Sequence, residues 1–505
     1  MRTFILILIL ACMMSGSVVM VDQDKEILKH YGNLITPADL KEYLNIIASD
    51  ALEGRRTGTR GQKMAAAFIS TQFQEIGLAG PLAGSYYQPF DLYSSVPSTI
   101  FIKSNGIRFD NYGEFFYTGS MDTGGEVQAE IVFVGKGREE DYAQVDVKEK
   151  AVVLFIGPLG PIASLRPAVQ LARTHGAKMV FVVSQSSKEE FHAYLNTRKS
   201  FFSSGGLSLK KPSEVSSNKG IFVINQPVAE KFFNTTFDKL RKAAEDPGKK
   251  SLKKIKPGIV TYEVSIEVTT VRTENVLGYL EGTDKKDELV VVTAHYDHIG
   301  LASSGEDRIN NGADDDGSGT VTVMELGKIF AQAKMEGHGP RRSMLFMTVA
   351  AEELGLLGSE YYVEHPIYPL ANTVVDLNID MIGRIDLEHQ DDRYYVYVIG
   401  SDKLSTDLHQ LSEATNAAYT KLKFDYTYND ENHPTNLYKR SDHWNFAKNG
   451  IPIIFYFDGI HEDYHKPTDE VSKIDFNVLA RRAHCIFFTA WEIANREERI
   501  TVDQK

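Results

Sequence analysis

The stretch Leu289–Gly300, with the sequence LVVVTAHYDHIG, decides the fold of this chain. Its opening run Leu289–Ala294 is apolar and rich in β-branched residues, which predicts a buried strand. The strand then ends in a cluster of ionisable residues that includes His295 and Asp297. Ligands of open α/β sheets bind at the carboxyl ends of strands, where a His can bind a metal ion while a nearby acid orients it. A His and an Asp that form a purely structural hydrogen bond would have the same sequence, so this stretch alone does not distinguish a metal site from a structural pair. Other segments of the chain provide the distinction.

Segments with the patterns of strands and helices alternate from this stretch towards the C-terminus. Such alternation predicts a mixed, mostly parallel twisted sheet with helices on both faces, which is an α/β fold. A helix at Pro37–Ile47, with Thr36 as its N-cap, is predicted near the other end of the chain. The predicted strands are Tyr262–Val271, Asn275–Leu280, Ser343–Ala350, Val374–Asp380, Tyr394–Ile399 and Pro452–Phe457, and the predicted helices are Val321–Ala333, Ser405–Thr415 and Phe476–Ala494.

The chain has 505 residues, which is too many for one hydrophobic core and predicts at least two domains. Residues 121–261 contain strand-like runs and a helix, but few clusters of chemically reactive residues. We predict that they form a separate β-rich insert of ordinary domain size. Residues 25–120 and 262–500 would then make up the other, discontinuous domain.

Residues 1–16 carry one Arg, a short apolar run and then small residues, which is typical of a secretory signal within residues 1–20. The run Ile9–Cys12 resembles a bacterial lipoprotein cleavage box, so a lipid anchor on Cys12 is one expectation and an ordinary cleaved signal is the other. Both predict an exported protein that is periplasmic, a cell-envelope lipoprotein or secreted. The second cysteine, Cys485, lies in an apolar helical pattern and is expected to be buried.

The composition narrows the choice of partners. The formal net charge is −13 and no long basic block is present, so nucleic acid is not an expected partner. Beyond the N-terminal signal, no run is long and apolar enough to predict a membrane-spanning helix. The oligomeric state is not predicted by any of these features.

Five clusters of metal-type donors lie at or just after predicted strand ends. The carboxyl ends of parallel strands gather at one edge of a sheet, so His, Asp and Glu side chains from these clusters would meet there. Nitrogen and oxygen donors of this kind suit one or two divalent cations, with zinc as the first choice. The clusters are His295 with Asp297, Asn310–Gly319, Ala350–Gly355, Asn378–Met381 and Tyr464–Asp469.

Each cluster taken alone also has a structural explanation. Asp314–Gly317 could be an ordinary Asp/Gly turn or a weak calcium loop. The acids Glu352 and Glu353 could be solvated residues at the start of a helix. Asp380 could be a paired acid at a strand end, and His465 could be a surface histidine. Five such coincidences at one sheet edge are improbable, so we favour a metal site.

The adjacent acids Glu352 and Glu353 indicate how such a site would work. Neighbouring side chains of an extended chain point to opposite sides. One Glu can therefore bind a metal ion while the other reaches a metal-activated water as a general base.

The order His-x-Asp, Gly-Ala-Asp-Asp, Glu-Glu, Asp-Met and His resembles the M28 family of zinc peptidases, the di-zinc aminopeptidases. Residues Ala48–Gly80 are similar to the N-terminal block of that family. The segments Val147–Ala151 and Gly176–Lys178 resemble a protease-associated (PA) domain, which would be the identity of the insert. The resemblance implies peptide substrates and two Zn²⁺ ions as cofactors.

The resemblance also implies a role for each donor. His295 and Asp380 would bind one zinc ion, and Glu353 and His465 would bind the other. Asp314 would bridge the two ions.

Three further residues receive roles from the resemblance. Asp297 would orient His295, and Glu352 would be the general base. Tyr438 lies three residues before Ser441–His443, a motif similar to the Ser-Asp-His of the family, and would donate a hydrogen bond to the oxyanion. In a tyrosine-rich loop, Tyr438 could equally be a packing residue.

The function expected from these residues is that of an exported zinc-dependent aminopeptidase. A carboxypeptidase or dipeptidase of the same fold is an alternative, for which Arg384 or Arg440 could bind the substrate carboxylate, although surface ion pairs would explain both. A binding module that uses the PA segment and keeps a vestigial site is a third.

Overall fold

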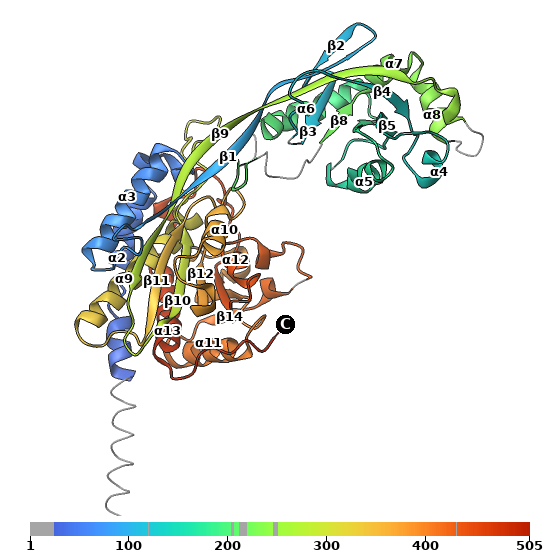
Figure 1. The fold of residues 1–505 in the computed structure, drawn as a ribbon. Coiled ribbons are helices and arrows are strands. Elements are labelled where there is room, and N and C mark those ends of the chain that lie inside the picture. The colour runs from blue at the N-terminus through green and yellow to red at the C-terminus, as the bar shows by residue number, and fades with distance from the viewer. Residues whose placement is uncertain are drawn as a thin grey trace, which may run out of the picture. The chain divides into compact units, whose positions relative to one another are not determined.

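The computed structural model describes residues 25–119, 121–160, 162–203, 207–211, 220–245, 251–430 and 432–504. The predicted signal peptide and Cys12 lie outside these residues, so both stay predictions. The chain forms two compact units, of which the first contains residues up to Asp91 and from Arg272 onwards, and the second is Leu92–Val271 (Figure 1). The second unit extends further at both ends than the predicted insert 121–261, and its identity as a PA domain remains a prediction.

The first unit is built on a mixed, mostly parallel sheet, which confirms the predicted fold class. Its strands are β9 (Gly258–Leu280), β10 (Lys285–His295), β11 (Arg342–Val349), β12 (Thr373–Ile379), β13 (Tyr395–Ile399), β14 (Lys423–Asp425) and β15 (Ile453–Phe457). The strand order is β14-β13-β15-β12-β10-β11-β9. Strand β10 is central and parallel to both β11 and β12, whereas β9 is antiparallel to β11. The two strands predicted at Tyr262–Val271 and Asn275–Leu280 are one continuous strand, β9.

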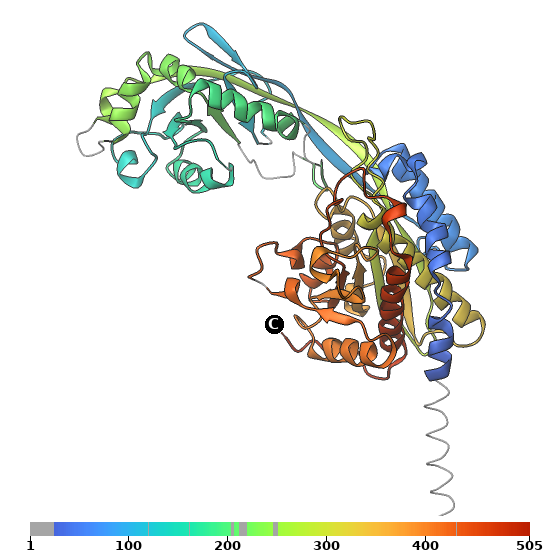
Figure 2. The ribbon, with the colours of Figure 1, turned by 180° about the vertical axis from the view of Figure 1, so that it is seen from behind.

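Helices cover both faces of this sheet, and they are α2 (Pro37–Ile47), α3 (Arg60–Glu75), α9 (Gly319–Met335), α10 (Leu357–Glu364), α11 (Thr406–Tyr419), α12 (His443–Ala447) and α13 (Phe476–Asn495). Helices α9 and α13 contact β10 and β11, while α12 contacts β12, β15 and α10. Figure 2 shows the blue N-terminal helices on the side of α13. The predicted N-cap of α2 is confirmed, because the Thr36 hydroxyl accepts a hydrogen bond from the N–H of Asp39 at 3.2 Å.

The central strand β10 is buried on both faces. Leu289 and Val291 lie in one hydrophobic cluster with Tyr362 of α10 and Phe446 of α12. Successive side chains of a strand point to opposite faces, so Val290 and its equivalents face the layer of α9 and α13. Burial on both faces explains why this stretch is a continuous apolar run rather than an alternating one.

The second unit contains the strands that continue the sheet beyond β9, in the order β9-β4-β5-β6-β8-β3. Separate hydrophobic clusters contain alternate residues of these strands, such as Val153 in one and Val152 in the other. Its strands are β1 (Tyr87–Ser104), β2 (Ile107–Asp110), β3 (Phe115–Thr118), β4 (Val127–Phe133), β5 (Ala151–Phe155), β6 (Met179–Val183), β7 (Leu207–Ser208) and β8 (Ile221–Ile224), and its helices are α4 (Glu139–Tyr142), α5 (Arg166–Thr174), α6 (Lys188–Ser203), α7 (Gln226–Phe233) and α8 (Phe237–Glu245). Within the described residues, no helix has both the length and the apolar character required to cross a membrane.

Candidate metal centre

Three neighbouring parallel strands of the first unit deliver ionisable side chains to one edge of the sheet. Strand β10 ends at His295 itself, and strand β12 ends one residue before Asp380. Strand β11 ends at Val349, shortly before Glu352 and Glu353. Because β11, β10 and β12 are neighbours and parallel, their carboxyl ends lie together, as the sequence predicted.

A first group of donors surrounds Nε2 of His295. This nitrogen lies 3.2 Å from Oδ1 of Asp315 and 3.5 Å from Oδ1 of Asp380. All three side chains are buried or nearly so. The group therefore combines one imidazole with two carboxylate oxygens, a donor set that zinc accepts.

A second group of donors surrounds Nε2 of His465. This nitrogen lies 3.1 Å from Oδ2 of Asp315 and 3.1 Å from Oε2 of Glu353. His298 contacts the other oxygen of this Glu, with 2.7 Å between its Nδ1 and Oε1. The carboxylate of Asp315 thus belongs to both groups, because one of its oxygens faces His295 and the other faces His465.

The spacing of the donor atoms fits tetrahedral metal coordination. Ligands at about 2.0–2.2 Å from a zinc ion in a tetrahedron lie about 3.3–3.6 Å from one another. The distances from Nε2 of His295 and of His465 to the carboxylate oxygens around them are 3.1 to 3.5 Å. The residues present therefore fit a divalent ion such as zinc.

The position predicted for the bridging acid was wrong by one residue. Asp314 does not lie between the two histidines, since its Oδ1 accepts a hydrogen bond from the N–H of Gly383 at 2.7 Å and its Oδ2 lies 3.2 Å from Nε2 of His461. Asp315 occupies the predicted place. The run Asp314–Asp316 offers three adjacent acids, and only the conformation of this irregular loop determines which one faces the donors.

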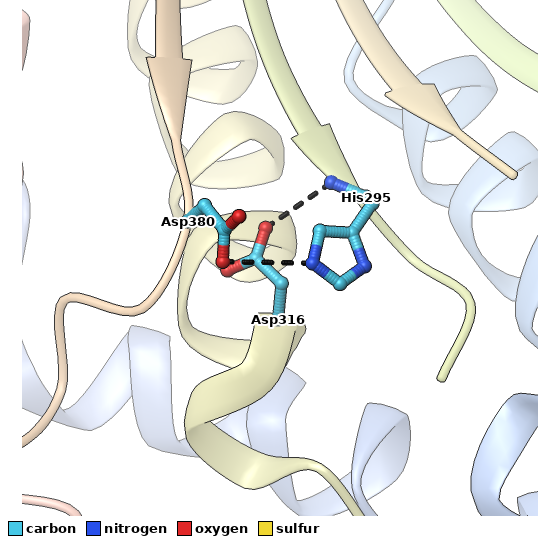
Figure 3. Close-up of side chains that lie close together, drawn as sticks. All are labelled: His295, Asp316 and Asp380. Carbon is cyan, nitrogen blue, oxygen red and sulfur yellow. Dashed lines mark hydrogen bonds and ion pairs between the residues drawn. The ribbon is translucent and has the colours of Figure 1, made fainter. Parts of the chain in front are cut away.

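The third acid of this run, Asp316, holds the backbone around the first group. Its carboxylate accepts hydrogen bonds from the main-chain N–H groups of His295 (3.1 Å), Gly319 (2.9 Å) and Met381 (3.1 Å). Figure 3 shows Asp316 beside His295 and Asp380, with one dashed line from Asp316 to the His295 backbone and another between the Asp380 carboxylate and the His295 ring. Asp316 thus ties β10, α9 and the end of β12 together.

Asp297 lies next to His295, although the contact differs from the one predicted. The nearest atom to Nδ1 of His295 is the main-chain oxygen of Asp297, at 3.1 Å, whereas its carboxylate Oδ1 is 3.9 Å away. The carboxylate accepts hydrogen bonds from the Thr57 hydroxyl (2.7 Å) and from the N–H of Glu352 (3.2 Å). Burial raises the pKa of Asp297 to about 6. The main-chain carbonyl of Asp297 therefore orients the ring of His295. The carboxylate of Asp297 holds the backbone of Glu352.

Glu352 lines the cavity that the donors surround, together with His295, Asp315 and Asp380. Its Oε2 lies 4.0 Å from Nε2 of His295. Burial raises the pKa of Glu352 well above its ordinary value, and neighbouring carboxylates add to the increase while His295 opposes it. A carboxyl group with a raised pKa beside a reaction cavity is suited to accept and return a proton.

The two histidines of the donor groups have raised pKa values. Burial lowers the pKa of His295, but the carboxylates around it, with Asp380 foremost, outweigh burial and raise it well above its ordinary value. Burial also lowers the pKa of His465, but hydrogen bonds to Asp315 and Glu353 raise it to about 10. Surroundings that attract protons this strongly also attract divalent cations, which displace protons from imidazole nitrogens.

The role predicted for Tyr438 at the oxyanion stays a prediction, and a second tyrosine lies at the cavity. Tyr438 is absent from the described residues that line the cavity and packs against Trp444 and His443, with ring centroids at 5.7 and 5.9 Å. Tyr464 lines the cavity instead, and its ring stacks on His465 with 3.9 Å between centroids. Its place directly before the predicted ligand His465 was the signal in the sequence that could have identified it.

The two arginines considered as carboxylate binders have different surroundings. Arg384 donates a hydrogen bond to Asp463 at 3.0 Å, so an ion pair occupies its guanidinium. Arg440 lines the cavity and, among the described residues, has no ion-pair partner. The lining of the cavity also includes apolar side chains, with Leu437 and Phe457 among them.

Residues 275–490 match the family model described as peptidase family M28. This matched segment carries all the donors named above.

Individual relatives and one solved structure are similar to this chain. The chain is 26% identical over 239 residues to "Aminopeptidase YwaD" of Bacillus subtilis, covering 46% of this chain and 47% of that protein. It is 29% identical over 218 residues to a "Probable leucine aminopeptidase" of Trichophyton verrucosum, covering 42% of this chain and 55% of that protein. The match thus spans about half the length of these relatives. The structure titled "Aminopeptidase from Aneurinibacillus sp. strain AM-1" superimposes with a TM-score of 0.52 at 21% identity, over 94% of this chain and 97% of that one, which supports the fold.

Proposed function

We propose that this protein is a zinc-dependent aminopeptidase that removes N-terminal residues from peptides. The observation that carries the proposal is the carboxylate of Asp315, which lies between a group containing His295 and a group containing His465. Glu352 lines the same cavity and supplies a carboxyl group that can move a proton. Relatives named as aminopeptidases support the choice of peptide substrates.

The residues of the cavity have distinct tasks in the proposed reaction. Two zinc ions held by the donor groups would activate a water molecule and polarise the carbonyl of the first peptide bond. Glu352 accepts the proton of that water as general base and then donates it to the leaving amino group as general acid. The Asp297 carboxylate holds the N–H of Glu352 and thereby keeps the residue in place.

Tyr464 is proposed to stabilise the negative charge that develops on the carbonyl oxygen. Burial raises the pKa of the Tyr464 hydroxyl, and the carboxylates of Asp315 and its neighbours raise it further, so the hydroxyl keeps its proton and can donate it in a hydrogen bond. Such a donor lowers the barrier because it interacts more strongly with the developing oxyanion than with the ground-state carbonyl.

A second candidate function is favoured by the position of Arg440. A guanidinium at the wall of the cavity can bind a substrate carboxylate through two hydrogen bonds. A dipeptidase or carboxypeptidase would use such a contact for the free carboxyl end of its substrate. A relative named "Probable glutamate carboxypeptidase LAMP1", 31% identical over 125 residues, has a name consistent with this alternative.

The proposed function is tested by measuring metal content and cleavage in the same preparation. We expect about two zinc ions per chain and hydrolysis of a leucine anilide that stops when a chelator is added. Acetylation of the amino group should abolish cleavage, because an aminopeptidase needs a free amino end. Peptides with a free and an amidated carboxyl end serve as the matched pair for the alternative.

Each outcome separates the candidates. Cleavage that depends on a free carboxyl end and tolerates acetylation would favour the carboxypeptidase and contradict the aminopeptidase. A strict need for both free ends would favour the dipeptidase. A preparation without zinc and without cleavage would contradict both, and would favour a binding module with a vestigial site.

Export is also proposed, with a lipid anchor on Cys12 as one form of it. The proposal rests on the pattern of residues 1–16. Mass spectrometry of the protein recovered from its native cell would show a shortened N-terminus, with or without added acyl chains, and a full-length N-terminus would contradict it.

A further inference from the structure

A short segment from the N-terminal part of the chain, Gly54–Thr57, contacts the loops that carry the donors. Arg55 ends the 3₁₀ turn Asp50–Arg55 and is fully buried. Its guanidinium donates hydrogen bonds to four main-chain carbonyls. The acceptors are the oxygens of Tyr296 (2.8 Å from Nε), Ile47 (2.7 Å from Nη1), Asn311 (2.5 Å from Nη1) and Gly312 (3.0 Å from Nη2).

Two of the segments joined by this guanidinium hold the donors themselves. Tyr296 directly follows His295, and Gly312 lies three residues before Asp315. The guanidinium is planar and presents its N–H groups in a rigid fork, so it fixes the separation of the carbonyls that it binds. One side chain thus connects the end of strand β10 with the loop of the shared carboxylate.

Main-chain contacts hold the segment in place around Arg55. The carbonyl of Arg55 accepts a hydrogen bond from the N–H of His298 at 3.3 Å, and that of Gly54 accepts one from Gly300 at 3.0 Å. Gly54 has a φ of +68°, and a Cβ atom there would lie 2.6 Å from the main-chain oxygen of Asn310. Glycine is therefore required at this position for Arg55 to reach the carbonyls.

Thr57 makes the second side-chain contact from this segment. Its hydroxyl donates a hydrogen bond of 2.7 Å to Oδ2 of Asp297, whose main-chain oxygen faces the ring of His295. Two side chains of the segment, those of Arg55 and Thr57, therefore act on neighbours of the donors.

We propose that Arg55, assisted by Thr57, is a positioning residue for the metal centre: it holds the end of β10 and the Asp315 loop at the separation that the two ions require. Metal sites depend on ligand positions that are fixed to within about 0.5 Å. The inference rests on the proposed two-metal site, and it assigns to the N-terminal block a task in metal binding rather than in stability alone.

A matched control distinguishes positioning from general stabilisation. Arg342 is also buried, and its Nη1 donates hydrogen bonds to the main-chain oxygens of Ile493 (2.9 Å) and Arg496 (2.6 Å). It lies at the start of β11, whereas the donors follow the end of that strand. Its removal should cost stability without disturbing the donors.

The experiment compares Arg55→Lys with Arg342→Lys in the full chain. Zinc affinity is measured by competition with a chromogenic chelator, the visible spectrum is recorded after loading with Co²⁺, and thermal unfolding is followed without metal. We expect Arg55→Lys to weaken zinc binding at least about tenfold and to change the cobalt spectrum, as loss of a contact behind metal ligands does. Arg342→Lys should lower the unfolding temperature and leave both metal readouts unchanged.

Several results would overturn the inference. The inference would be overturned if Arg55→Lys kept the zinc affinity and the cobalt spectrum of the wild type. It would also be overturned if Arg342→Lys changed both of these readouts as much as Arg55→Lys does. If Arg55→Lys does not fold, Thr57→Val decides, because an unchanged spectrum and affinity in that variant would refute positioning by this segment. A wild-type protein that binds no zinc would instead refute the proposed function itself, before any variant is compared.

Discussion

The hydroxyl of Ser441 donates a hydrogen bond of 2.7 Å to Oδ2 of Asp380, the carboxylate oxygen that does not face His295. Ser441 in turn accepts a hydrogen bond of 2.9 Å from the side-chain amide of Asn378. This chain of buried polar groups fixes the direction in which Oδ1 of Asp380 points. A donor whose second oxygen is held in this way has less freedom to turn away from an ion.

Replacing Ser441 by Ala should therefore loosen the first donor group. We expect zinc affinity at that group to fall by about 10- to 100-fold, as is usual when a contact behind a metal ligand is lost. Chelator competition measures the change. Ser359→Ala is the control, since Ser359 is equally buried but donates to Asp442, which is not a donor in either group. Equal affinity in the two variants would contradict the role of Ser441.

Glu352→Gln should separate metal binding from turnover. Gln keeps the size and polarity of the side chain but cannot accept a proton, so kcat should fall by about 10² to 10⁴-fold while zinc content stays unchanged. Activity and zinc content are measured on the same sample. Near wild-type kcat in this variant would remove Glu352 from the mechanism.

Substitutions of the adjacent acids Asp314 and Asp315 should have different effects on zinc binding. Asp315→Asn removes charge from the carboxylate shared by both groups, so zinc content and activity should both collapse, with activity at least about 100-fold lower. Asp314→Asn removes the ion pair with His461 and should lower the unfolding temperature while zinc stays bound. Zinc loss in Asp314→Asn with retention in Asp315→Asn would restore the sequence-based assignment.

Two tyrosine variants test which hydroxyl serves the oxyanion. Tyr464→Phe should lower kcat by about 100-fold with a small change in KM, because an oxyanion donor acts in the transition state. Tyr438→Phe should leave kcat close to that of the wild type. The reverse order of effects would show that packing, rather than catalysis, explains the position of Tyr464.

A pH-dependent contribution to stability is expected from Glu325 in helix α9. Burial raises its pKa from 4.5 to about 7, although Lys328, with 3.2 Å between Nζ and Oε1, opposes the shift. The folded state therefore binds the proton more tightly than the unfolded state. This contribution is fully present below pH 4.5 and is lost as the pH rises through 7.

The variant Glu325→Gln removes this titration. The free energy of unfolding of the wild type, relative to the variant, should fall by about 3 kcal/mol between about pH 4 and about pH 8. Urea unfolding at both pH values measures the difference. Parallel pH profiles for the two proteins would show that Glu325 keeps its ordinary pKa in the fold.

The sequence predicts those parts of the molecule that depend on local pattern. The apolar run Leu289–Ala294 is a strand because burial on both faces leaves no position for polar side chains. The cap at Thr36 depends on one hydrogen bond to Asp39, only three residues away. The assembly of donors at one sheet edge follows from parallel strands and needs no detail of side-chain geometry.

Other parts depend on loop conformation and could not be predicted in the same way. The choice between Asp314 and Asp315 is made by an irregular turn in which non-helical backbone angles occur at Asp315. The guanidinium of Arg55 finds its partners more than 200 residues away in the chain, at Tyr296 and Asn311. A single sequence contains no local signal for such a contact.

The two histidines of the metal centre differ in their access to solvent. The side chain of His465 is 37% exposed, whereas that of His295 is 1% exposed. An ion held by His465 and Glu353 can be approached by water and chelators from outside, while an ion beside His295 leaves only after the surrounding protein opens. During dialysis against a weak chelator, a species that has lost only the ion at His465 should therefore persist for a long time. The activity of a preparation would then depend on its earlier exposure to metal ions and chelators.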